Sequence, residues 1–234
     1  MAGTEKQPRR ERRIVAKIGK ALGILVLLAY EDLVILIWPG GPLGDTRAFA
    51  VILAADLAIG FDVFVRPSLA TRSQKDEYAT WKVYAFFVAS PLLLGLPWIE
   101  RDLLARRWLP EAALSALWWI GLAATLGGGV LLAWARLTLG RFGSPKVLVQ
   151  EDHRLVTSGP YRALRNPMYA ADLLLYCGVA IALGAVGSAA FAVAALLPML
   201  VGRTRLEERL LAERFGDEYR AWAARTWRLV PFVW

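Results

Sequence analysis

A basic segment with two prolines groups arginine, asparagine and tyrosine side chains that are able to bind a ligand. It reads GPYRALRNPMYAAD from Gly159 to Asp172 and places Arg162, Arg165 and Asn166 between two tyrosines. Guanidinium groups bind carboxylates and phosphates through paired hydrogen bonds, so one interpretation is a site for an anionic group. Taken alone, however, two arginines at the start of an apolar run are better explained as anchors that hold the loop at a membrane interface.

A second charged segment begins at Arg203 and reads RTRLEERLLAERFGDEYRAW. Its leucines and aromatic residues recur at helical spacing, which predicts an amphipathic helix with a kink at Gly216. Glu207 and Glu208 are adjacent and therefore cannot share a face. Glu208 lies three residues before Leu211, close to the apolar face, where a carboxylate needs a partner. Glu207 is equally well explained as a surface charge paired with an arginine.

The elements that must position these segments are apolar. Of the 234 residues, 57% are hydrophobic, which indicates a membrane protein rather than a soluble domain. Five apolar runs cover residues 21–38, 48–65, 83–99, 113–135 and 169–202. The last run breaks at Gly184–Gly187, which predicts a hairpin of two short helices. We therefore expect an all-α fold, a polytopic membrane helix bundle of about six spans with a C-terminal amphipathic helix.

Positive charge predicts the orientation of the chain. With six crossings and a cytoplasmic N-terminus, all but four of the 28 lysines and arginines lie on the cytoplasmic side. The positive-inside rule then places both termini in the cytoplasm. Three arginines of the 100–112 loop are exceptions, because this arrangement places them on the outer side. The net charge of +8 is thereby explained by basic loops and not by nucleic acid. Residue usage suggests a bacterial inner membrane, and the first run is expected to be an uncleaved span.

The histidine, the cysteine and the acidic residues within apolar runs limit the kinds of site that the chain can contain. One histidine, His153, and one cysteine, Cys177, argue against a metal site of His and Cys ligands. Acidic residues within apolar runs are costly and are usually paired or functional. Among them, Glu31 and Asp56 are candidates for attracting a substrate with an amine head group.

The C-terminal half resembles the superfamily of isoprenylcysteine carboxyl methyltransferases and phospholipid methyltransferases, which are integral-membrane enzymes. The resemblance covers roughly Leu139 to Phe232 and rests on the order of its motifs. These are the loop HRLVTSGPYRALRNPMY, an apolar hairpin, the Glu-Glu pair of RLEERLLAERFGDEYRAW, and RLVPF. Asn166 departs from the pattern, because many members have histidine there. The N-terminal runs carry no such match.

The resemblance implies methyl transfer from S-adenosylmethionine to a lipid or isoprenoid amphiphile at the cytoplasmic membrane face. Together with the charge and hydropathy patterns, it divides the chain into a basic cytoplasmic tail (1–20), transmembrane helices for substrate access (21–135) and a cofactor-binding half (136–234). Two alternatives stay open: a membrane NAD(P)H-dependent reductase of the sterol reductase type, and a non-catalytic membrane protein that binds a partner. The bilayer is the expected partner, nucleic acid is not, and the oligomeric state is open.

The resemblance also nominates site residues. The catalytic candidates are Arg165, Asn166 and Glu208. Gly159 is equally explained by turn geometry and His153 by a solvated loop. The cofactor-binding candidates lie in the loop or the acidic pair: His153, Leu155, Val156, Gly159, Tyr161, Arg162, Pro167, Tyr169, Glu207 and Glu208.

Overall fold

The computed structural model describes residues 45–65, 92–142 and 154–231, and every structural statement below refers to these parts of the chain. They contain helices and no strand, as expected; one isolated β-bridge joins Leu164 and Trp227. Residues 92–100 are also helical. The named elements are α2 (Thr46–Val65), η2 (Arg101–Ala105, a π-helical turn), α4 (Arg106–Trp108), α5 (Glu111–Leu139), η3 (Gly140–Phe142), η4 (Gly159–Arg162), α6 (Pro167–Ala182) and α7 (Val186–Ala223).

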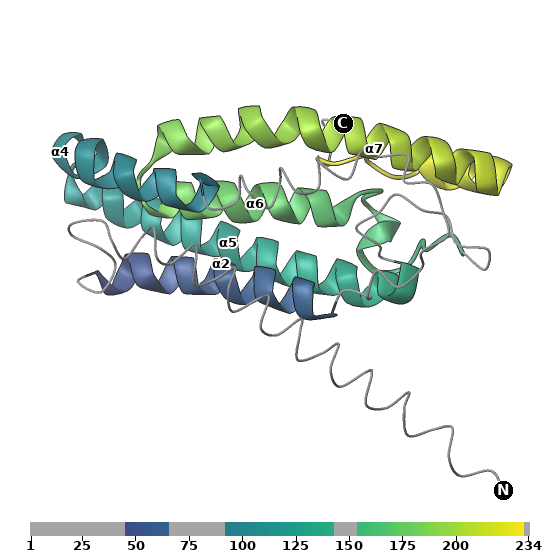
Figure 1. Ribbon diagram of the computed structural model, residues 1–234, viewed down its shortest axis with the longest axis horizontal. Helices are drawn as coiled ribbons and strands as arrows, with labels where there is room; N and C mark the ends of the chain where they lie inside the picture. The colour runs from purple at the N-terminus through teal and green to yellow at the C-terminus, as the bar shows by residue number, and fades with distance from the viewer. Residues whose placement is uncertain (1–44, 66–91, 143–153, 232–234) are drawn as a thin grey trace, which may run out of the picture.

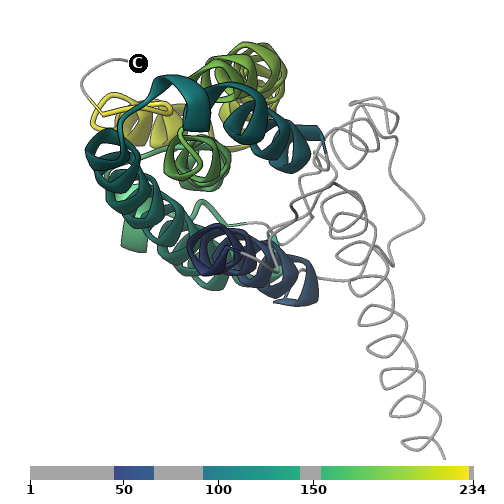
Figure 2. The same cartoon turned by 90° about the vertical axis from the view of Figure 1, so that its left-hand side faces the viewer.

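The long helices lie side by side along the long axis of the molecule (Figures 1 and 2). α6 packs between α5 and α7, and α5 also packs against α2. α2, α5 and α7 begin at the same end of the bundle, and α6 runs in the opposite direction. The loop before α6 and the charged part of α7 are therefore neighbours at the other end.

Glycines allow α5 and α6 to approach until their backbones touch. A Cβ atom added at Gly121 would lie 2.1 Å from the backbone nitrogen of Ala182. One added at Gly178 would lie 2.6 Å from the backbone nitrogen of Thr125. Small residues at a helix contact are the usual route to close packing between membrane helices. The close packing of α5 against α6 therefore depends on glycine at these positions.

The outward faces of the bundle are apolar. On α2, the exposed residues Phe49, Leu53, Leu57 and Phe61 are spaced four apart, while Asp56 is buried on another face. An exposed apolar stripe of this kind suits lipid, not water. α2, α5 and α7 are long and apolar enough to cross a membrane by length and composition, and α6 is a shorter apolar helix. The fold is that of an integral membrane protein.

The break between α6 and α7 falls where the glycines predict it, with Gly184 at a φ of 72°. Glu100 closes this turn, because its carboxylate accepts hydrogen bonds from the backbone nitrogens of Gly187 (2.8 Å) and Ser188 (2.6 Å) at the start of α7. These are amide groups that a helix N-terminus otherwise leaves without acceptors.

Two expectations about the helices were wrong. The second arm of the hairpin is not a short helix, because α7 continues for 38 residues from the apolar arm into the charged tail. Strong helix formers such as Arg, Leu and Glu follow the apolar arm without a breaker until Gly216, where the expected kink occurs (φ 55°, ψ −121°). The 100–112 segment is mostly helical and not a loop. Run 21–38 and most of run 83–99 lie outside the described residues, so the number of spans stays a prediction.

Candidate functional site

The loop before α6 is fixed at its first turn, η4. Gly159 has a φ of 57°, and a Cβ atom there would lie 2.7 Å from Oγ1 of Thr138 on α5. Glycine is thus required both by backbone conformation and by space. Tyr161 is buried, and its carbonyl accepts a hydrogen bond from Nε1 of Trp222 on α7 (2.9 Å). The loop is therefore held between the ends of α5 and α7.

Arg165 joins the loop to α7 and to the segment that follows it. Its Nε donates to Oε1 of Glu208 (3.0 Å), and its Nη1 donates to the carbonyls of Ala223 and Thr226 (2.5 Å each). Glu208 also accepts from Nε of Arg228 (2.9 Å). One carboxylate, with 13% of its side chain exposed, is thus shared by two guanidinium groups.

Asn166 binds the same C-terminal segment. Its backbone nitrogen and its Nδ2 both donate to the carbonyl of Arg228, at 3.2 and 3.0 Å. It is the residue before α6, and Pro167 begins the helix, where a missing N–H costs nothing. The Asn166 side chain is buried and holds the loop in register with residues 226–228.

The second acid of the pair has its own partners. The Tyr169 hydroxyl donates to Oε1 of Glu207 (2.5 Å) and accepts from Nε of Arg203 (2.5 Å). Arg203 also pairs with Glu207 at 3.0 Å. Glu207 and Glu208 thus face different partners, as adjacent helical residues must. We call the residues Arg165, Asn166, Tyr169, Glu207 and Glu208 the loop–tail site.

A buried ion pair lies close to this site. Nε of Arg136, near the end of α5, donates to Oδ1 of Asp62 on α2 (2.5 Å), with side chains only 3% and 5% exposed. Burial raises the pKa of the nearby Tyr161 hydroxyl, and the positive charge of Arg136 opposes that shift only in part. Tyr161 therefore stays neutral at physiological pH.

The structure brings most of the nominated residues together. Leu155 and Val156 pack against the apolar cluster that contains Tyr161. Arg162 is exposed, and its guanidinium has no partner among the described residues. His153 and Glu31 lie outside the described residues. Asp56 is buried in the middle of α2, away from the loop–tail site.

Sequence reasoning missed three residues that shape the site, Arg136, Arg228 and Trp222, and offered Arg203 as an ordinary surface partner of the acidic pair. The spacing of Arg203 and Glu207, four apart on a helix, is a usable signal for their ion pair. The contacts of the other three join segments far apart in the chain, for which no local pattern exists.

The donor and acceptor set fits S-adenosylmethionine. An amino-acid carboxylate needs a cation, which Arg162 offers; an ammonium group or ribose diol needs carboxylates, which Glu207 and Glu208 offer. Nη2 of Arg165 makes no hydrogen bond to the described part of the chain, so it is available as a second donor to an anionic group. Tyr161 and its apolar neighbours provide the kind of wall that a purine ring prefers.

Comparison with known proteins confirms the resemblance. The sequence model of the phospholipid methyltransferase family matches residues 117–218, which contain the whole loop–tail site. Protein-S-isoprenylcysteine O-methyltransferase B of Arabidopsis thaliana is 34% identical over 122 residues, or 50% of this chain and 61% of the relative. Methanethiol S-methyltransferase of Pseudomonas deceptionensis is 29% identical over 208 residues, or 83% of this chain and 74% of the relative. The chain thus spans about 61% of the length of the plant relative.

The fold has a counterpart of known structure. The eukaryotic intramembrane Ras methyltransferase ICMT (isoprenylcysteine carboxyl methyltransferase) superposes with a TM-score of 0.61 at 21% sequence identity. The superposition covers 92% of this chain and 75% of that protein. At this identity, the likeness establishes a shared membrane fold.

Proposed function

We propose that this chain, whose residues 117–218 match the phospholipid methyltransferase family, is an integral-membrane methyltransferase that uses S-adenosylmethionine. One observation carries the proposal. Arg165 and Glu208, 43 residues apart in the chain, meet in an ion pair inside the matched region. Tyr169 and Glu207 meet in a hydrogen bond that joins the same two segments.

In this proposal the loop–tail site holds the cofactor. Arg162 and the open side of Arg165 bind its carboxylate, Glu207 and Glu208 bind its ammonium or ribose hydroxyl groups, and Tyr161 lies against the adenine. When bound, S-adenosylmethionine supplies an electrophilic methyl group on a sulfonium. A direct displacement asks the protein chiefly for orientation and exclusion of water.

The roles of Arg165 and Asn166 follow from their contacts. Both fix the loop to residues 223–228, so each acts first as a positioning residue. A neutral amide bound to a carbonyl cannot transfer a proton at neutral pH. We therefore assign no acid–base role to Asn166, and an acceptor that needs deprotonation must find its base elsewhere.

The acceptor in this proposal is a lipid or isoprenoid amphiphile that enters from the membrane. The loop–tail site lies at one end of a bundle with apolar outer faces, which leaves an apolar acceptor tail in lipid while its head group reaches the site. The helices of residues 21–135 then give substrate access, and residues 136–234 hold the cofactor.

The test uses the purified full chain in detergent. Calorimetric titration with S-adenosylhomocysteine and with NADPH should give binding of the first and none of the second. Transfer of labelled methyl from S-adenosylmethionine is then measured with a prenylcysteine analogue, phosphatidylethanolamine and methanethiol. Binding of NADPH alone would favour a reductase, and binding of neither would leave a non-catalytic partner protein.

A further inference from the structure

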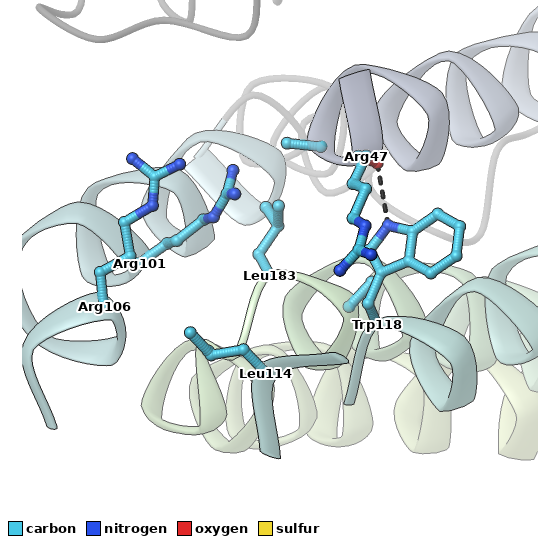
Figure 3. A pocket seen from close by; sticks show the side chains of 8 residues that line it. Arg47, Arg101, Arg106, Leu114, Trp118 and Leu183 are labelled. Carbon is cyan, nitrogen blue, oxygen red and sulfur yellow. Dashed lines mark hydrogen bonds between the residues drawn. The ribbon is translucent and has the colours of Figure 1, made fainter. Parts of the chain in front are cut away.

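A pocket lies at the end of the bundle opposite to the loop–tail site, where α2 and α5 begin and α6 ends (Figures 1 and 3). Three arginines line it: Arg47 on α2, Arg101 in η2 and Arg106 on α4. The 16 residues of α6 separate the two ends by roughly 24 Å, at about 1.5 Å per residue. We call this feature the arginine pocket.

The arginine pocket has an excess of positive charge, because no carboxylate is among its lining residues. Asp45 binds both Arg101 and Arg106, and Asp102 binds Arg106 at 3.2 Å. Arg47 has no carboxylate partner within the described residues. Its guanidinium instead lies 5.6 Å from the ring centre of Trp118 (Figure 3). Three cations thus share two acids.

Arg101 of the pocket and its neighbour Trp98 have buried donors without acceptors among the described residues. The Arg101 side chain is only 12% exposed, and its Nη1 has no acceptor among the described residues. Nε1 of Trp98 is likewise without one, and the Arg101 guanidinium lies 5.1 Å from the Trp98 ring centre. A buried donor that lacks an acceptor is unfavourable and rare, and an anion would supply what is missing.

The pKa of Asp45 indicates the electrostatic environment of its carboxyl group. Burial by itself would raise the pKa of this carboxyl, yet the hydrogen bond and charge of Arg101 and two backbone amides bring the pKa below its usual value of 3.8. At this carboxyl, Arg101 and the two backbone amides thus outweigh the effect of burial. A second anion there would be favoured for the same reason.

We propose that the arginine pocket binds one phosphate-type anion, held by Arg47, Arg101 and Arg106. The remaining walls, which include Leu114, Trp118 and Leu183, are apolar. This combination suits the phosphate of an anionic membrane lipid whose acyl chains lie against the outer faces of the helices. A free phosphate offers the same acceptor oxygens, so the two sources are separated by experiment.

The experiment measures the melting temperature of the purified full chain in detergent during titration with dioleoylphosphatidylglycerol, dioleoylphosphatidylcholine or sn-glycerol 3-phosphate. Arg47→Gln and Arg106→Gln should each raise the half-saturating concentration of phosphatidylglycerol about tenfold or more, since each removes a charge-assisted contact. Arg107→Gln is the matched control, because Arg107 is exposed in the same helical turn and does not line the pocket. It should titrate like the wild type.

Each outcome decides the proposal. A saturable rise in melting temperature with phosphatidylglycerol alone supports the site with a lipid as its source. An equal rise with glycerol 3-phosphate supports the site with a soluble source. No preference for phosphatidylglycerol or glycerol 3-phosphate over phosphatidylcholine, or equal losses in Arg47→Gln and Arg107→Gln, would overturn it. Methyl transfer is not measured, so the result is independent of the proposed function.

Discussion

The carboxylate of Glu208 gives the sharpest test of the proposed cofactor site. It accepts from Arg165 at 3.0 Å and from Arg228 at 2.9 Å with 13% of its side chain exposed. In the proposed site Glu208 also binds the ammonium or ribose hydroxyl groups of the cofactor, so Glu208→Ala removes a contact with the cofactor as well as the acceptor of both guanidinium groups. Losing one partner of a desolvated charge pair costs about 2–5 kcal/mol. Because water reaches this site in part, we expect about 2 kcal/mol, or a roughly 30-fold loss of affinity for S-adenosylhomocysteine.

The assay is calorimetric titration of four proteins: the wild type, Glu208→Ala, Arg165→Ala and the double variant. Arg165→Ala should weaken binding at least about tenfold. The two residues share one contact, so the double variant should lose less than the sum of the single losses. Arg220→Ala is the matched control, because Arg220 is 66% exposed and pairs with the exposed Asp217. It should bind as the wild type does.

Two results would refute this reasoning. If both single variants bind S-adenosylhomocysteine like the wild type while their melting temperatures fall, the ion pair only holds the loop in place. If the single losses add in full, Arg165 and Glu208 do not act through their shared contact. Equal melting temperatures of all four proteins would show that a loss of affinity is not a loss of fold.

Four further predictions address the framework and the substrate side. Gly121→Val should destabilise the protein by about 3 kcal/mol or more in a circular dichroism melt, because even a Cβ there lies 2.1 Å from the α6 backbone; an unchanged melt would contradict the close contact. Asp45 has a lowered pKa in the folded state, so its carboxylate stabilises the folded protein at neutral pH. This stabilisation is lost as the pH falls below about 3.8 and through the pKa of the folded state. The drop in melting temperature between pH 7 and pH 3 should therefore be smaller in Asp45→Asn, and equal drops would count against it. Asn166→His should keep its affinity for S-adenosylhomocysteine in titration, since a ring N–H can donate to the same carbonyl; a tenfold loss would disagree. Asp56→Asn should lower methylation of phosphatidylethanolamine more than it lowers cofactor affinity, and equal losses of both would make the acid structural.

The sequence predicted helices well where one local pattern decides them. Apolar runs at 48–65 and 113–135 correspond to α2 and α5 within a few residues, because continuous apolar sequence favours a helix that satisfies its own backbone. The turn at Gly184 and the kink at Gly216 were predicted because a glycine takes positive φ at little cost. The full length of α7 was not predicted, because hydropathy shows where an apolar stretch ends and not where a helix ends.

The candidate site was predicted only as a set of residues. That Glu208 needs a partner follows from its place near an apolar face, but the identity of Arg165 and Arg228 as partners does not. The carbonyls that hold Arg165 belong to the end of α7 and the segment after it, and backbone groups carry no sequence signal. Arg101 and Arg106 appeared only as exceptions to a charge rule, and the pocket that they share with Arg47 emerged from the fold.

The part of α7 before its kink at Gly216 also limits how this chain can change in evolution. The helix is fixed at one end by the contacts of Glu100 with Gly187 and Ser188, and at the other by those of Glu207 and Glu208. An α-helix turns by about 100° and advances about 1.5 Å for each residue. One inserted or deleted residue between these ends would swing both acids away from their partners on the loop. Between residues 188 and 207 a change of length by one residue is therefore more disruptive than a substitution on the exposed face of the helix.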